Sequence, residues 1–142
     1  MTTIPLAKAK IIIEKTLETG RTQGMNPLSV AVLDAGGHLI AFERSDGASA
    51  GRFQFADGKA NAALMLGIPT SAIMARAEQQ PHFSSAMSAA FQGRFIPLSG
   101  GVLVTDEQGQ IIGAVGVTGD TSENDAIAAT AGVQAAGFTP IA

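Results

Sequence analysis

Hydrophobic positions recur along this chain with two periods, one typical of helices and one typical of strands. Apolar residues spaced three and four apart predict helices, and short β-rich runs bounded by turn residues predict strands. Helices are predicted over residues 3–20, 51–66, 70–92 with a break near Pro81, and 122–136. Strands are predicted over residues 28–34, 38–44, 94–98, 102–104 and 111–117. The chain therefore mixes both kinds of element.

Turn residues join four of these strands into two hairpins. Ala35-Gly36-Gly37 separates the first pair, and Asp106-Glu107-Gln108-Gly109 separates the last pair. Hairpins before and after a helical block favour an antiparallel sheet with segregated helices over a wound parallel sheet. The predicted fold class is α+β, with an antiparallel five-stranded sheet flanked by helices in an α-β-α arrangement. Residues 1–142 are expected to form a single domain, because this length suits one core.

The last predicted helix carries residues that are typical of a helix start and of a buried helix face. Ser122 is predicted to cap it, with Asp125 in a capping-box-like position three residues later. The helical period predicts that Ile127, Thr130 and Val133 face inward.

Composition narrows the functional classes. The chain has 142 residues, of which 46% are hydrophobic and 15% are charged. This apolar composition favours a homo-oligomer, because assembly covers apolar patches that a small monomer would expose. The net charge of −3 and the lack of Lys/Arg runs argue against nucleic-acid binding. The chain has no cysteine, which removes thiolate metal ligands and cysteine nucleophiles.

The N-terminal segment does not read as a targeting signal or a membrane span. Its longest apolar run is Ile11 to Ile13, far shorter than a signal-peptide core. The default interpretation is a soluble cytoplasmic protein that binds no membrane. A leader that had been removed would leave the same sequence.

Several familiar site motifs are incomplete. Gly113, Gly116 and Gly119 recur at every third position, which is not the Gly-x-Gly-x-x-Gly fingerprint of dinucleotide-binding proteins. His38 and His82 stand far apart and outside a His-Glu-x-x-His pattern, so no zinc site is expected. Either histidine could supply the one axial ligand that haem iron needs, and the competing interpretation is a solvated surface histidine.

Charged residues near predicted element ends offer a second kind of site. Arg44 ends a predicted strand, and Lys59 lies on a predicted helix with few other charges around it. Arg44 and Lys59 could converge on a ligand carboxylate. With Asp46 nearby, a structural ion pair is the other interpretation, and the residues leave both open. Gly119, just before the last helix, favours an ordinary strand-to-helix joint over a small-anion site.

Five segments together resemble the GlcG/HbpS-like family of small haem-binding and catabolic-operon proteins. They are VLDAGGHL at 32–39, R-x-DGA at 44–48, KA at 59–60, GGV at 100–102 and IGAVGV at 112–117. The resemblance implies a profilin-like α-β-α domain with an antiparallel sheet. It also implies assembly into dimers or larger oligomers and a ligand site near a subunit boundary.

Function varies within the family that the chain resembles. Some members are haem-binding sensors, one kind is fused to a corrinoid adenosyltransferase, and others belong to degradation pathways where a cofactor-free hydrolase has been suggested. This sequence departs from the common form at two positions. Ala126 stands where an acidic residue is frequent, and Asp120 stands where a small residue is frequent. Both changes alter the charge at the expected pocket mouth.

The first functional hypothesis is a small-molecule-binding accessory or sensor protein, with haem as the preferred single ligand and no other cofactor required. Cations would hold the carboxylates of the ligand, glycine backbone would admit a flat molecule, and His38 is a candidate iron ligand. The expected ligand-binding residues are Arg44, Lys59, Gly100, Gly101 and Gly119.

The second hypothesis is a cofactor-independent hydrolase or isomerase that acts on a small carboxylate in a catabolic pathway. The same cations would bind the acid, and Asp120, Glu123 or Asp125 would serve as the general base. A base in that role needs a raised pKa and a place beside the substrate. A third hypothesis is a scaffold whose oligomeric surface is its function.

Overall fold

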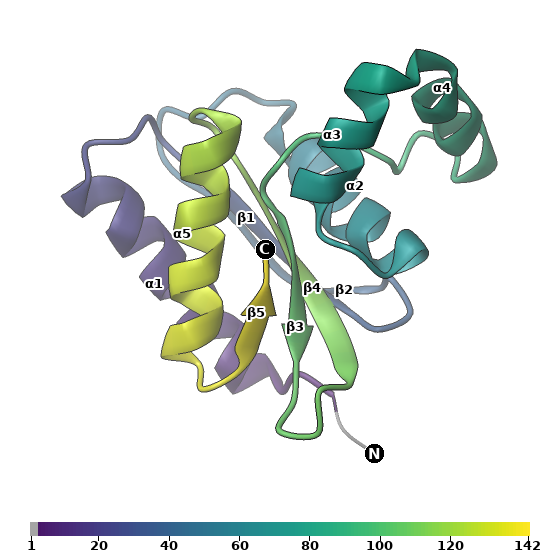
Figure 1. Cartoon of the computed structure of the whole chain (residues 1–142). Coiled ribbons are helices and arrows are strands. Elements are labelled where there is room, and N and C mark those ends of the chain that lie inside the picture. The colour runs from purple at the N-terminus through teal and green to yellow at the C-terminus, as the bar shows by residue number, and fades with distance from the viewer. Residues whose placement is uncertain (1–2) are drawn as a thin grey trace.

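The computed structural model describes residues 3–142, which form helices on both faces of one sheet (Figure 1). The helices are α1 (Leu6–Thr22), α2 (Arg52–Leu66), α3 (Thr70–Gln79), α4 (Pro81–Ala90) and α5 (Ser122–Ala135). The strands are β1 (Ser29–Asp34), β2 (Leu39–Arg44), β3 (Gly101–Thr105), β4 (Ile111–Thr118) and β5 (Thr139–Ile141). The predicted α+β class with a five-stranded sheet is confirmed.

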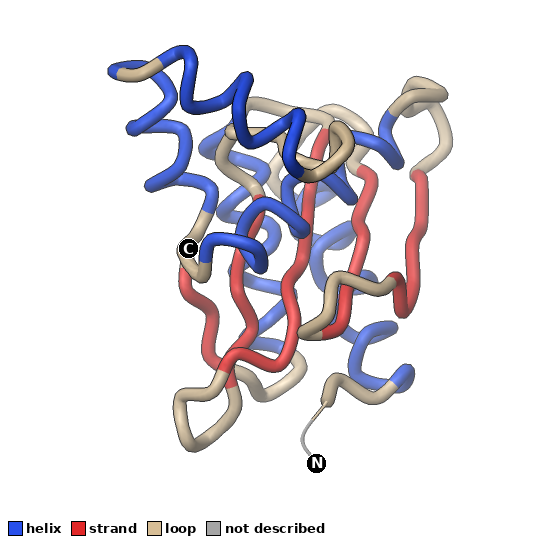
Figure 2. Tube along the Cα trace, turned by 90° about the vertical axis from the view of Figure 1, so that its right-hand side faces the viewer, coloured by secondary structure: helices blue, strands red, loops and turns tan. Residues whose placement is uncertain are grey.

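The sheet runs in the order β2-β1-β4-β3-β5, and each neighbouring pair is antiparallel (Figure 2). Both predicted hairpins are present, because β1 pairs with β2 and β3 pairs with β4. The turns place Gly37 at φ +84° and Gly109 at φ +77°, a left-handed conformation that glycine adopts without strain. The central pairing of β1 with β4 joins the two hairpins into one sheet.

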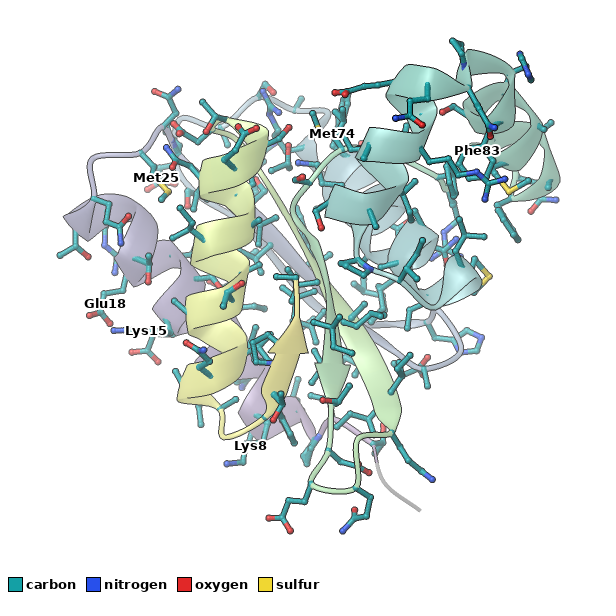
Figure 3. All side chains as sticks on the ribbon, in the orientation of Figure 1. Lys8, Lys15, Glu18, Met25, Met74 and Phe83 are labelled. Carbon is teal, nitrogen blue, oxygen red and sulfur yellow. The ribbon has the colours of Figure 1, made fainter. Side chains whose placement is uncertain are left out.

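Each face of the sheet has its own hydrophobic core. Valines of β1, β3 and β4 pack with apolar residues of α1 and α5, and α1 and α5 lie side by side on that face. The opposite face packs Leu33, Leu103 and Ala114 against Ala60 and Ala63 of α2. Beyond α2, the helices α3 and α4 stand away from the sheet and form a third cluster around Phe83, which Figure 3 labels.

The prediction of an edge strand over residues 94–98 is wrong. This segment packs along α2 instead, where the Ile96 amide donates a hydrogen bond of 3.1 Å to the Gly58 carbonyl oxygen. The Ile96 side chain lies against Gly58, so a side chain at position 58 would collide with it. The fifth strand is β5 at the C-terminal end, which follows the turn at Gly137 and pairs with β3.

The predicted start and inner face of α5 also need correction. Thr121 caps the helix, with its side-chain oxygen accepting a hydrogen bond of 3.1 Å from the Asn124 amide, and Ser122 is the first helical residue. Asp125 is turned into the protein and does not close a capping box. Val133 is buried as predicted, whereas Ile127 is 48% exposed. The reason is that inward placement of Asp125 fixes which side of the helix faces the sheet.

Two glycines let the backbone of α2 rest directly on the sheet. Gly101 and Gly116 are paired across β3 and β4, so they lie side by side. A Cβ on Gly116 would overlap the Ala56 carbonyl oxygen, and a Cβ on Gly101 would overlap the Lys59 carbonyl oxygen. Close packing against a helix therefore explains the glycine at position 116.

We predict that Gly116→Ala destabilises the fold by about 3 kcal/mol, because helix backbone cannot move aside as a side chain can. Urea unfolding followed by circular dichroism measures this loss. Gly51→Ala is the matched control, since nothing lies within 4 Å of a Cβ at Gly51. Equal midpoints for Gly116→Ala and the wild type would contradict the packing described.

Candidate functional site

A buried ion pair joins the two layers of helices at one end of the sheet. The Lys59 ammonium on α2 lies 3.0 Å from the Asp125 carboxylate on α5, and the two side chains are 3% and 2% exposed. Lys59 Nζ also donates a hydrogen bond of 2.9 Å to the Val117 carbonyl oxygen near the end of β4. The pair thus links helices that cover opposite faces of the sheet.

Two glycines near this pair are closely surrounded, Gly100 by the pair itself and Gly119 by the loop at residues 25–28. Gly100 has φ +121°, and a Cβ there would lie 3.0 Å from Lys59 Nζ and 3.1 Å from the Asp125 Cβ. Gly119 has φ +140°, and a Cβ there would overlap the Pro27 carbonyl oxygen. Both positions therefore require glycine for conformation and for space.

Asp125 is also bound from the loop that precedes α5. Its Oδ1 accepts a hydrogen bond of 3.0 Å from the Asp120 amide, so both carboxylate oxygens have partners. The Asp120 carboxylate in turn accepts hydrogen bonds from the Asn26 amide at 2.9 Å and from the Asn124 side chain at 2.7 Å. These hydrogen bonds lower the pKa of Asp120, and the bond from the Asn26 amide has the largest effect. The loop at residues 25–28 is thereby fastened to the start of α5.

Burial governs the electrostatics of the pair. It lowers the pKa of Lys59, and the charge of Asp125 opposes this shift. Burial likewise raises the pKa of Asp125, and the charge and hydrogen bond of Lys59 oppose it. Each ion is held in the interior by its partner and by backbone groups, which is the condition for burying charge. Both groups are enclosed, and the hydrogen bonds described here join them to each other and to backbone groups.

Arg44 lies in a different place, at the rim of an open cavity of about 470 Å³. The cavity lies between the end of α1, the loop at residues 25–28 and the end of β2. Arg21 from α1 shares the lining with Arg44, and the nearby acids are Glu43 and Asp46. Neither guanidinium makes an ion pair within residues 3–142.

The apolar part of this cavity comes from Leu17, Met25 and Leu28. Figure 3 shows Met25 beyond the end of α1 and beside the first turn of α5. The loop that carries Met25 therefore lines the cavity, and it is also hydrogen-bonded to Asp120 through the Asn26 amide. A change at the ion pair can reach the cavity wall through this loop.

The structure thus divides the residues that sequence reasoning grouped together. Lys59, Gly100, Gly101, Gly119, Asp120 and Asp125 gather at the buried pair, and Arg44 lies across the loop at residues 25–28. Glu123 is exposed in the first turn of α5. Sequence reasoning missed Arg21, whose signal was its place one turn after Leu17 on the first helix. The contact between Asn26 and Asp120 left no local signal, because 94 positions separate them.

His38 lies in the hairpin turn between β1 and β2, and its side chain is 81% exposed. Its Nδ1 is 3.2 Å from Asp34 Oδ1, which also accepts hydrogen bonds from the amides of Gly36 and His38. Burial tends to raise the pKa of Asp34, and these bonds together outweigh it and lower the pKa. With Nδ1 beside the carboxylate, Nε2 is left to solvent or to a metal. His82 is exposed at the start of α4.

His38 and Arg44 flank opposite ends of β2. A strand rises about 3.3 Å per residue, which separates the two positions by roughly 20 Å. The lining of the cavity at Arg44 includes no histidine.

Among residues 3–142, no three His, Asp or Glu side chains cluster as they would around a metal ion. In the same residues, no helix is both long enough and apolar enough to span a membrane.

The chain belongs to the HbpS-like family. The family model described as "Haem degrading protein HbpS-like" matches residues 4–134, which is nearly the whole chain and includes the buried pair and the Arg44 cavity. No curated protein matches the chain.

Three solved structures have a similar fold. A PduOC:haem complex superposes with a TM-score of 0.85 at 20% identity, covering 96% of this chain and 97% of that one. A double mutant of HbpS from Streptomyces reticuli gives a TM-score of 0.80 at 29% identity, with coverage of 94% and 87%. The Klebsiella pneumoniae protein ORFY gives 0.83 at 29% identity, with coverage of 96% and 92%.

We predict that removing either charge of the Lys59–Asp125 pair destabilises the fold, because the remaining charge is then buried without a counter-ion. Lys59→Met should cost about 3 to 5 kcal/mol, because it leaves a buried carboxylate without a cation. Asp125→Asn should also destabilise, and the double variant Lys59→Met/Asp125→Asn should lose less than the sum of the two. Urea unfolding of all four proteins measures this coupling. Simple additivity would contradict a mutually dependent pair.

Proposed function

We propose that this chain is a small-molecule-binding accessory or sensor protein whose ligand occupies the cavity of Arg21 and Arg44, with haem as the preferred ligand. One observation carries the proposal. Two arginines that have no ion-pair partner among residues 3–142 line one open cavity together with apolar side chains. Guanidinium groups bind carboxylates in a bidentate fashion, and the apolar wall suits the body of an amphipathic ligand.

Haem fits this description better than a small acid alone, because it combines two carboxylates with a broad apolar ring. Membership in the HbpS-like family supports the same ligand, as does the haem present in the PduOC complex. Arg21 and Arg44 would hold the propionates, and Leu17 and Met25 would contact the ring edge. When bound, haem would supply its own iron chemistry, and this cavity lining offers it no histidine.

The alternative of a hydrolase or isomerase has less support, because none of the three candidate bases has the properties of a general base. Asp125 has both oxygens engaged in the core, and the hydrogen bonds of Asp120 lower its pKa, which makes it a poor base. Glu123 is exposed on the outer first turn of α5. A small carboxylate can nevertheless compete for the same two arginines, so it belongs in the binding test.

Titration of haemin into the purified protein tests the proposal. The Soret band of haemin should shift on binding to the wild type. Arg44→Gln and Arg21→Gln should each weaken binding about tenfold or more, because each removes a charged hydrogen-bonding partner of a propionate. Arg76→Gln is the matched control, since Arg76 is exposed on α3. A wild-type protein that leaves the Soret band unchanged would overturn haem as the ligand.

The same titration decides the role of His38. If iron were held by His38 at the other end of β2, His38→Ala would change the Soret band of the bound form, and Arg44→Gln would not weaken binding. His82→Ala is the control, because His82 is exposed on α4 and Asp34 does not orient it. Loss of binding in the arginine variants with an unchanged spectrum in His38→Ala favours the cavity.

A further inference from the structure

An arginine at the start of α2 is held by hydroxyl groups and not by a carboxylate. Arg52 Nε donates a hydrogen bond of 3.0 Å to Ser49 Oγ, and Arg52 Nη1 donates one of 2.9 Å to Thr118 Oγ1 at the end of β4. Within residues 3–142, Arg52 makes no ion pair and its Nη2 donates no hydrogen bond. We call Arg52, Ser49, Thr118 and the neighbouring Ser29 the Arg52 cluster.

Ser29 brings a buried hydroxyl to this cluster. It is paired with Thr118 across β1 and β4. Leu33 packs on the α2 face of the sheet, and the alternation of a strand puts Ser29, four residues earlier, on the same face. Ser29 is 0% exposed, and its Oγ has no hydrogen-bond partner among the described residues. Buried hydroxyls in proteins nearly always have a partner, so this one is evidence that a bound group supplies an acceptor.

The two other hydroxyls of the cluster are also donors without an acceptor. Ser49 Oγ and Thr118 Oγ1 each accept a hydrogen bond from Arg52, so the O–H of each must donate elsewhere. Neither O–H donates to another group within residues 3–142. Thr118 is 2% exposed, which keeps its hydroxyl away from bulk water. The guanidinium and the hydroxyls therefore need the same thing, a shared acceptor.

The start of α2 favours a negatively charged acceptor. This helix of 15 residues follows Gly51 without a side-chain cap and has no acidic residue in its first turn. Unpaired amides at a helix start attract a negative group. Nothing lies within 4 Å of a Cβ on Gly51, so the space beside the helix start is open. Burial does most to lower the pKa of Lys59, and the charge of Arg52 adds to this shift, so the two cations are within electrostatic reach.

We propose that the Arg52 cluster binds the phosphate group of a small molecule. The phosphate would accept hydrogen bonds from Arg52 Nη2, from the hydroxyls of Ser29 and Thr118, and from amides at the start of α2. Phosphate suits the cluster better than a carboxylate, because three terminal oxygens accept from more donors than two. None of the residues in the cluster lines the Arg44 cavity, so this site goes beyond the proposed function.

The exposure of the cluster indicates how such a molecule would enter. Ser29 and Thr118 are buried, whereas Ser49 is exposed and Arg52 is half-buried. The phosphate would therefore rest on Ser29 and Thr118, and its fourth oxygen would carry the rest of the molecule outward past Ser49. This arrangement admits a phosphate monoester as well as inorganic phosphate.

An NMR titration with inorganic phosphate at constant ionic strength tests the site. The backbone amides of Gly51, Phe53 and Gln54 should shift and reach saturation. Arg52→Gln should weaken phosphate binding about tenfold or more, because it removes the charged donor. Arg76→Gln is the matched control, since Arg76 is exposed on α3. Shifts that do not saturate, or that are equal in Arg52→Gln and the wild type, would overturn the proposal.

Ser29→Ala separates a binding role from a structural one. Its hydroxyl has no partner in the protein, so the variant should unfold in phosphate-free buffer at the same urea concentration as the wild type or a higher one. Its affinity for phosphate should nevertheless fall several-fold. A Ser29→Ala variant that loses stability without phosphate and keeps the wild-type affinity would contradict the role of Ser29 as a donor to the ligand.

Three further titrations identify the ligand class and keep this site apart from the cavity. Methyl phosphate should bind at least as tightly as inorganic phosphate, and acetate should bind more weakly than both. Rejection of methyl phosphate would overturn a small-molecule ligand and leave a free-ion site, and tighter binding of acetate would overturn phosphate. Arg52→Gln should bind haemin as the wild type does, and loss of haemin binding would overturn the separation of the two sites.

Discussion

The buried ion pair between Lys59 and Asp125 is the constraint on which the rest of the structure depends. It ties α2 to α5 around the end of the sheet, with both ions almost fully removed from water. Two charges can be buried there only because backbone groups of Val117 and Asp120 complete their hydrogen bonding. Gly100 follows from the pair, since a side chain there would meet Lys59 and Asp125, and Gly119 leaves room for the loop at residues 25–28.

The pair is also connected to the cavity at Arg44 through a chain of hydrogen bonds. Through the Asp120 amide it holds the strand-to-helix joint, and through the Asp120 carboxylate that joint holds the loop at residues 25–28. The loop forms one wall of the Arg21 and Arg44 cavity. On the opposite side of α5, the inward turn of Asp125 leaves Ile127 outside. One interior contact therefore bears both on the wall of this cavity and on which side of α5 faces outward.

Local patterns in the sequence were sufficient for the hairpins and helices, because turn residues and hydrophobic period act over a few positions. They failed where a distant residue decides the outcome. Ser122 and Asp125 satisfy the rule for a capping box, yet Asp125 pairs with a lysine 66 positions away. The segment at residues 94–98 has strand-forming residues, and packing of Ile96 on Gly58 prevents pairing.

The candidate site shows the same limit. Sequence reasoning identified Arg44 and Lys59 as cations in a sparsely charged chain and left a ligand carboxylate and an ion pair equally open. The structure gives Lys59 a protein carboxylate and leaves Arg44 at a cavity, beside an arginine that no motif singled out. Membership in the HbpS-like family agrees with the fold, and the position of each side chain had to come from three-dimensional contacts.

Chemical labelling of lysines in the native protein tests the account most directly. Lys10 on α1 is exposed, whereas the Lys59 ammonium is enclosed with Asp125. With an amine acylating reagent and mass spectrometry, Lys10 should label at the rate of a free amine, and Lys59 only as fast as the whole protein unfolds. If Lys59 labels as fast as Lys10 in the folded protein, the pair is open to solvent and cannot be the structural centre described.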